Sequence, residues 1–170
     1  MTTVRVGPVR AALHAAVLSL TLLLAGCGFH LQGRQSLPPV LAAAHIDAVD
    51  AQSDFYLGLR AALRASGSTL QEEGSAGTAE IRILADGTNE RVLTVSAQNV
   101  QTAYRLDYKV RISVTVGGRE LMAPEDHTVS REYSFNESAL LAKEREKESL
   151  STALADELVT LVMRRLASLK

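Results

Sequence analysis

The sequence contains no tryptophan and only one cysteine, Cys27, among its 170 residues. A single cysteine excludes an intramolecular disulfide framework and any zinc site built from several thiolates. The sequence also lacks an excess of charge of one sign. It has 18 Lys and Arg residues and 19 Asp and Glu residues, which give a formal net charge of −1. This balance argues against a protein that binds nucleic acid through a basic surface. We therefore expect no nucleic-acid partner.

Motifs of catalytic and cofactor sites are missing as well. The four histidines, His14, His30, His45 and His127, are scattered, and none belongs to an H-x-x-x-H or H-E-x-x-H pattern. The sequence has no G-x-S-x-G motif and no glycine-rich phosphate loop. We therefore expect no catalytic residues, no metal site and no cofactor, and a periplasmic hydrolase has no nucleophile–base pair to support it.

Apolar residues gather near the start of the chain. Arg5 and Arg10 precede an apolar stretch at residues 11–24 that only a few polar residues interrupt. The stretch is shorter than the roughly 20 apolar residues that a membrane-spanning helix needs. A positive end followed by a short apolar core is typical of a secretory signal peptide.

The residues Leu24-Ala25-Gly26-Cys27 follow this stretch. They resemble the lipobox of bacterial lipoproteins, which implies cleavage after Gly26 and a Cys27 that carries S-diacylglycerol and N-palmitoyl groups. The alternatives are an ordinary signal peptide with a chance cysteine and a buried structural thiol. Several acyl chains would anchor the chain stably, since each buried methylene contributes about 0.8 kcal/mol. Gly28 stands where Asp favours inner-membrane retention in such lipoproteins, and so implies the outer membrane.

Three regions are therefore expected. Residues 1–26 form the signal peptide, residues 27–43 a lipidated lead-in, and residues 44–170 a single domain. Cleavage leaves 144 residues with 16 basic and 19 acidic side chains. A chain of this length can bury a hydrophobic core of its own.

The first part of the domain predicts a strand followed by a helix. The strand is expected over residues 44–49. Ser53 or Asp54 is a suitable N-cap for the helix, and Gly67 is a suitable end. The polar, glycine-rich residues 71–78 predict a loop.

Period-two alternation predicts the strands that come next. Ile81 and Ile83 flank a charged residue, and an extended stretch resumes at residues 92–95 after Asp86-Gly87. The Asp-Gly pair is the signal of a turn or a bulge.

The clearest alternation runs from Tyr104 to Val116, where apolar residues occupy every second position. Such a strand buries one face and presents the other to water or a partner. Gly117-Gly118 predicts a tight hairpin that returns the chain as residues 119–135. Pro124 places the return strand at a sheet edge or a bulge.

From Asn136 onward the apolar period becomes helical. The apolar stripe consists of Leu150, Leu154, Leu158, Leu161, Val162 and Leu166. The order β-α-β-β-β-α predicts an α+β fold, a small sheet of about four strands with two helices packed on one face. The first two strands, which are joined through a helix, are expected to be parallel neighbours.

Two groups of charges leave alternatives open. Arg105, Lys109 and Arg111 alternate with the apolar residues of the clearest strand. Their face is either solvated or a site for an anionic ligand or a partner. The run at residues 143–148 is either a solvated helix start with weak ion pairs or a docking surface.

Short motifs along the whole mature chain are similar to those of the lipopolysaccharide-assembly lipoprotein LptE (RlpB) family. They are residues 27–31, residues 101–103 at the start of a long strand, and residues 139–143 at the start of the last helix. The resemblance implies a domain that sits inside the β-barrel of LptD at the outer membrane. There it would act as plug and assembly factor and would bind lipopolysaccharide during its insertion into the outer leaflet.

The same resemblance carries Lys143 over as a lipopolysaccharide contact, beside the candidate cations Arg105, Lys109 and Arg111. Gln98-Asn99 departs from the family, because related chains can place a basic residue at this loop. The alternative function is a lipoprotein that activates a periplasmic cell-wall synthase.

Overall fold

The computed structural model describes residues 36–75, 77–95, 97, 101–134 and 140–169. In chain order the elements are a 3-10 turn η1 (Pro39–Leu41), β1 (Ala43–Ala48), α2 (Asp54–Ala65), β2 (Thr69–Gln71), β3 (Ala79–Val95), β4 (Gln101–Val116), β5 (Arg119–Ser134) and α3 (Leu140–Ala167).

The strands form one sheet in the order β2-β1-β3-β4-β5. β1 is parallel to both β2 and β3, whereas β3, β4 and β5 are antiparallel neighbours. The expected parallel pairing across the first helix is therefore confirmed, as is the α+β class. The count of about four strands was one too low. β2 has only three residues, too few for a sequence period, and it forms by pairing with Ala43–His45.

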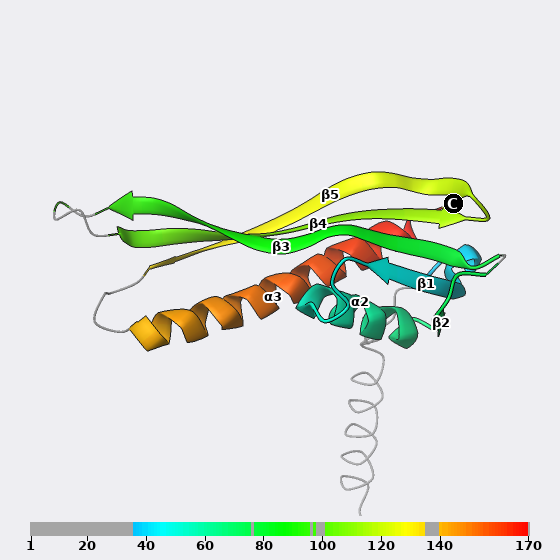
Figure 1. Ribbon diagram of the computed structural model, residues 1–170, viewed down its shortest axis with the longest axis horizontal. Helices are drawn as coiled ribbons and strands as arrows, with labels where there is room; N and C mark the ends of the chain where they lie inside the picture. The colour runs from blue at the N-terminus through cyan, green and yellow to red at the C-terminus, as the bar shows by residue number, and fades with distance from the viewer. Residues whose placement is uncertain (1–35, 76, 96, 98–100, 135–139, 170) are drawn as a thin grey trace, which may run out of the picture. The chain divides into compact units, whose positions relative to one another are not determined.

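β3 is much longer than its neighbour β1. The pairing of β1 with β3 ends at Ala48 and Ile83, and a register shift follows between Ile83 and Ala85. The Asp86-Gly87 signal thus accompanies a bulge, and β3 continues to Val95 without a turn. Figure 1 shows β3, β4 and β5 extending well past the end of β1.

The hairpin between β4 and β5 follows the prediction. Gly117 and Gly118 have φ angles of +56° and +78°, a conformation that glycine adopts without strain. Pro124 lies in the edge strand β5, within a register shift between the partners of Ile112 and Val114. Both roles expected for this proline, edge and bulge, are confirmed.

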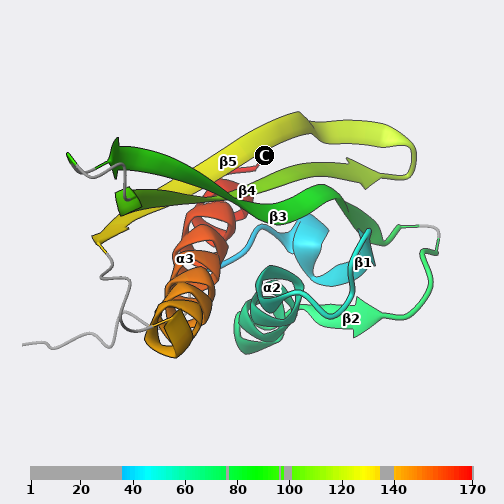
Figure 2. The ribbon, with the colours of Figure 1, turned by 60° about the vertical axis from the view of Figure 1, so that its left-hand side comes forward.

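Both helices cover the same face of the sheet (Figure 2). α2 begins as predicted, because the Ser53 side chain accepts a hydrogen bond from the N–H of Tyr56. The helices approach closely at Gly58, where a Cβ atom would lie 3.0 Å from Cγ2 of Val159. Fully buried residues of the core include Phe55, Leu59, Leu63, Ile81, Leu106, Val110, Ile112, Val114, Leu154, Leu158, Val162 and Leu166.

The two halves of α3 differ in burial. The second half carries the predicted stripe, and its leucines at 154, 158 and 166 are fully buried. Leu150 and Leu161 are only half-buried. Residues 144–149 are exposed apart from the half-buried Lys147, so these residues add little to the core.

Candidate functional site

The sheet face opposite the helices, here called the outer face, carries the predicted cations of β4. Arg105, Lys109 and Arg111 alternate with buried apolar residues, and their side chains are 41%, 52% and 50% exposed. Alternation brings them to one face, as predicted. Each cation also has a carboxylate partner there, which the sequence pattern did not reveal.

Asp126 of β5 lies between two of these cations. Its Oδ2 is 3.0 Å from Nζ of Lys109, and its Oδ1 is 3.9 Å from Nε of Arg111. The hydrogen bond from Lys109 is the main reason why the pKa of Asp126 lies below its usual value. One carboxylate shared by two cations leaves an excess positive charge at this part of the outer face.

Asp107 of β4 forms a second shared site. Its oxygens lie 2.6 Å from Nη2 of Arg91 and 3.2 Å from Nε of Arg105, and Oγ of Ser130 donates to Oδ1 over 2.6 Å. The Ser130 hydrogen bond, followed by the one from Arg91, holds the pKa of Asp107 below its usual range although burial opposes this. The carboxylate therefore bridges two arginines that face each other across the β3–β4 pair.

Arg91 is a residue of this surface that sequence reasoning missed. It lies in a stretch of β3 without clear alternation, and only the strand register places it opposite Arg105. The outer face also holds Arg82, which binds Glu80 over 2.6 Å and Asp47 over 3.3 Å. The face is therefore a mixed-charge surface on which Asp107 and Asp126 are each shared by two cations.

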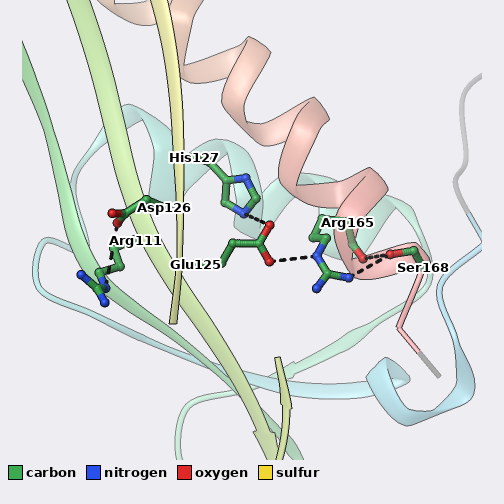
Figure 3. A network of polar contacts seen from close by, with 6 residues as sticks. All are labelled: Arg111, Glu125, Asp126, His127, Arg165 and Ser168. Carbon is green, nitrogen blue, oxygen red and sulfur yellow. Dashed lines mark hydrogen bonds and ion pairs between the residues drawn. The ribbon is translucent and has the colours of Figure 1, made fainter. Parts of the chain in front are cut away.

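The opposite side of β5 carries a different polar group (Figure 3). Glu125 points toward α3, where its Oε2 accepts from Nε of Arg165 over 3.0 Å, while its neighbour Asp126 points to the outer face. His127 is only 7% exposed, and its Nε2 is 3.7 Å from Oε1 of Glu125. Arg165 also donates to Ser168 over 3.2 Å. This network fastens β5 to the end of α3.

A second cross-layer contact lies near the start of α3. The Tyr133 hydroxyl donates to Oε2 of Glu90 over 2.7 Å, and Nζ of Lys147 is 3.2 Å from the same oxygen. The rings of Tyr133 and Tyr104 stack with centroids 5.5 Å apart. Burial, and then the nearby Glu90 carboxylate, raise the pKa of Tyr133. Lys147 therefore points toward the sheet, whereas its neighbours in the run 143–148 that have described side chains are exposed.

Several predicted residues lie outside the described part of the chain, namely Cys27, His30, Gln98 and Asn99. Lys143 lies in the first turn of α3, but its side chain is outside the described residues. Nδ1 of His45 donates to the carbonyl oxygen of Gln71 over 3.1 Å. Within the described residues, no three His, Cys, Asp or Glu side chains are placed to hold a metal ion. None of the described helices combines the length and apolar character needed to cross a membrane.

Comparison with known protein families shows to which family this chain belongs. Residues 41–166 match the LptE family model, described as lipopolysaccharide-assembly. The chain belongs to the LptE family. The resemblance noted in the short sequence motifs is thereby confirmed.

Individual relatives agree with this assignment. An LPS-assembly lipoprotein LptE of Yersinia enterocolitica is 27% identical over 146 residues, which cover 85% of this chain and 70% of the relative. An LPS-assembly lipoprotein LptE of Pectobacterium atrosepticum is 24% identical over 162 residues, 94% of this chain and 88% of the relative.

Solved structures share the fold. A lipoprotein B of Nitrosomonas europaea has a TM-score of 0.68 at 22% identity and covers 83% of this chain and 91% of its own. Rare lipoprotein B of Shewanella oneidensis has a TM-score of 0.67 at 21% identity, over 74% of this chain and 94% of its own.

Proposed function

We propose that this chain is a non-enzymatic outer-membrane lipoprotein that works inside the LptD β-barrel as plug and assembly factor for lipopolysaccharide. The observation that carries the proposal is the family match over residues 41–166. The relatives named above are LPS-assembly lipoproteins. The absence of a recognisable catalytic motif in the sequence agrees with a role based on binding.

The anchor would be Cys27. Residues 1–26 would be removed as a signal peptide, and residues 27–43 would connect the lipidated cysteine to the domain. Gly28 directly after the cysteine favours delivery to the outer membrane over retention at the inner one. The acyl chains would hold the protein on the periplasmic side of that membrane, since more than one chain gives stable anchoring.

The mixed charges of the outer face support a place inside a barrel. Interiors of outer-membrane barrels are polar, and a surface of closely paired charges can form hydrogen bonds with such a wall. The networks of Glu125 with Arg165 and of Glu90 with Lys147 connect the sheet to α3 at two separate places. Such cross-connections favour a rigid body, which a plug requires.

Lipopolysaccharide would bind through its phosphates. Lys and Arg form charge-assisted hydrogen bonds with phosphate oxygens. Lys109 and Arg111 share one carboxylate, Asp126, so they retain positive charge for such a ligand. Arg105 and Lys143 are the other proposed contacts, Lys143 because of the family motif at the start of α3.

Co-purification tests the proposal. The full mature lipoprotein, carrying an affinity tag at its C-terminus, is extracted from outer membranes in mild detergent. We expect folded LptD to be recovered in equal amounts with it. Folded LptD that purifies without this protein, or a cell-wall synthase recovered in place of LptD, would overturn the proposal.

A further inference from the structure

Apolar side chains lie beside the cations of β4 on the outer face. In the pairing of β3 with β4, Ile83 lies opposite Ile112 and Ala85 lies opposite Arg111, so Leu84 is the extra residue of a bulge. In such a bulge two residues of one strand face a single residue of the other, and Leu84 and Ala85 share the place opposite Arg111. Leu84 is 38% exposed, whereas Ile83, which faces the helices, is 1% exposed. Leu84 and Ala85 therefore belong to the outer face.

Val49 extends this apolar surface from β1. Its N–H donates to the carbonyl oxygen of Ile83 over 3.4 Å, so it continues the pairing of β1 with β3 by one residue and lies next to Leu84. Side chains alternate between the two faces of a strand, and Asp47, two residues earlier, forms its ion pair on the outer face. Val49 is 67% exposed, which agrees with a place on the same face. We call Val49, Leu84 and Ala85 the apolar patch.

Gly87 leaves an open space next to the apolar patch. It follows Ala85 on the outer face and lies opposite Lys109 in the register of β3 and β4. A Cβ atom at Gly87 would have no heavy atom within 4 Å apart from those of its chain neighbours, and the φ angle of this glycine is not positive. Because glycine permits a close approach to the backbone, a ligand can reach the sheet beside Lys109.

The two cations that border this space share one carboxylate. Asp126 lies 3.0 Å from Nζ of Lys109 and 3.9 Å from Nε of Arg111, and its neighbour Glu125 points to α3 instead (Figure 3). We call Lys109 and Arg111 the cation pair. One carboxylate offsets one of the two positive charges, so the pair keeps charge for one anionic group. An anionic group and an apolar group of the same ligand can therefore bind side by side.

We propose that this part of the outer face binds an acylated phosphate ester, with the phosphate between Gly87 and the cation pair and an acyl chain along the apolar patch. Charge-assisted hydrogen bonds hold the phosphate oxygens, and burial of apolar surface holds the chain. Two sources have this chemistry, the glycerophospholipids of a membrane and the lipid A part of lipopolysaccharide. The inference rests on the function proposed above, which names the cation pair as phosphate contacts, and it adds the acyl-chain contact and the space at Gly87.

Native mass spectrometry of the full mature lipoprotein in a neutral detergent counts the lipids that stay bound. Phosphatidylglycerol carries a charged phosphate and acyl chains, phosphatidylcholine has the same chains without net charge, and glycerol 3-phosphate has the phosphate without a chain. We expect phosphatidylglycerol to bind at least about tenfold more tightly than either of the other two. Lipid A is the fourth probe, and the tighter of lipid A and phosphatidylglycerol identifies the source of the ligand.

Filling the open space separates binding from folding. Gly87→Thr places a side chain where the phosphate lies in the proposal, and threonine is more favourable than glycine in a strand. Binding of the tighter lipid should weaken about tenfold, while the thermal unfolding midpoint stays equal or rises. Asn89→Thr, two residues further along the same face, is the matched control and should leave binding unchanged.

Two exposed leucines test the acyl-chain contact. Leu84→Gln combined with Val49→Thr makes the patch polar and should weaken lipid binding about tenfold. Leu57 of α2 is 49% exposed and lies in the helix layer on the opposite side of the sheet. Leu57→Gln should therefore leave binding unchanged.

Removal of the shared carboxylate should strengthen binding, which a purely structural role of Asp126 would not do. Asp126→Asn takes away the negative charge between Lys109 and Arg111 and should tighten phosphatidylglycerol binding about threefold. Asp156→Asn, at an exposed position of α3, is the control and should have no effect.

Three outcomes would overturn the proposal. The first is equal binding of phosphatidylglycerol and phosphatidylcholine, or of phosphatidylglycerol and glycerol 3-phosphate. The second is wild-type lipid binding by Gly87→Thr. The third is an equal effect of the patch variant and of Leu57→Gln. Recovery of LptD with the tagged protein tests the function proposed above without these lipids, so a failure of that function and a failure of this inference are told apart.

Discussion

The two faces of β4 are made by one stretch of chain but have opposite environments. Toward the helices, Leu106, Val110 and Ile112 are fully buried. On the outer face, Arg105, Lys109 and Arg111 are about half exposed, and each lies beside an aspartate. The buried face therefore supplies the stability of the fold, while the outer face is free to vary its charges for a partner or ligand.

The largest effect that tests this comparison is expected at two adjacent residues. Ile112→Ala removes buried apolar volume and should lower the free energy of unfolding by about 3 kcal/mol. Arg111→Ala, one position away on the outer face, should change it by less than about 0.5 kcal/mol. Urea denaturation of both variants measures the difference. If both variants lost a similar free energy of unfolding, the outer face would contribute as much to stability as the buried face does.

A smaller effect is expected for ligand binding at the outer face. Replacing Lys109 and Arg111 together with Gln removes the excess positive charge around Asp126 and should weaken lipopolysaccharide binding about tenfold. Lys143→Asp should weaken it as well. Titration calorimetry compares these variants with a control in which Arg60 and Arg64 of α2 are replaced by Gln. If the Lys109 and Arg111 double variant bound lipopolysaccharide with unchanged affinity, the outer face would not be a lipopolysaccharide site and could serve only to dock a protein partner.

The smallest effect concerns pH. Because the pKa of Asp107 is lower in the folded state than in the unfolded chain, its carboxylate stabilises the fold above pH of about 4. This contribution is lost as the pH falls through the folded pKa. Asp107→Asn should lower the free energy of unfolding by about 1 kcal/mol at neutral pH.

Urea denaturation at a series of pH values measures this dependence. The variant should lose less stability than the wild type when the pH is lowered below about 4. Glu132→Gln, at the position opposite Arg105 on β5, is the control and should follow the wild type. If the free energy of unfolding of Asp107→Asn and of the wild type changed with pH in the same way, the stabilising role of the Asp107 carboxylate between Arg91 and Arg105 would be contradicted.

Sequence patterns predicted the parts of the fold that depend on neighbouring residues. The N-cap Ser53, the Gly117-Gly118 hairpin and the alternation from Tyr104 to Val116 all depend on local backbone geometry. The same alternation correctly placed Arg105, Lys109 and Arg111 on one face. The family was also recognisable from short motifs, and the match over residues 41–166 confirmed it.

The features that only the tertiary structure decided depend on which strands meet and in what register. The short strand β2 exists because Thr69–Gln71 lie beside Ala43–His45. The sharing of Asp107 between Arg91 and Arg105, and of Asp126 between Lys109 and Arg111, requires the β3–β4 and β4–β5 registers. The long β3–β4–β5 part of the sheet continues past β1, because β1 has 6 residues and β3 has 17. The sequence by itself therefore determined the segments and their buried faces, because periodicity is local. Charge sharing and the order of the strands required the structure, because strand pairing joins residues far apart in the chain.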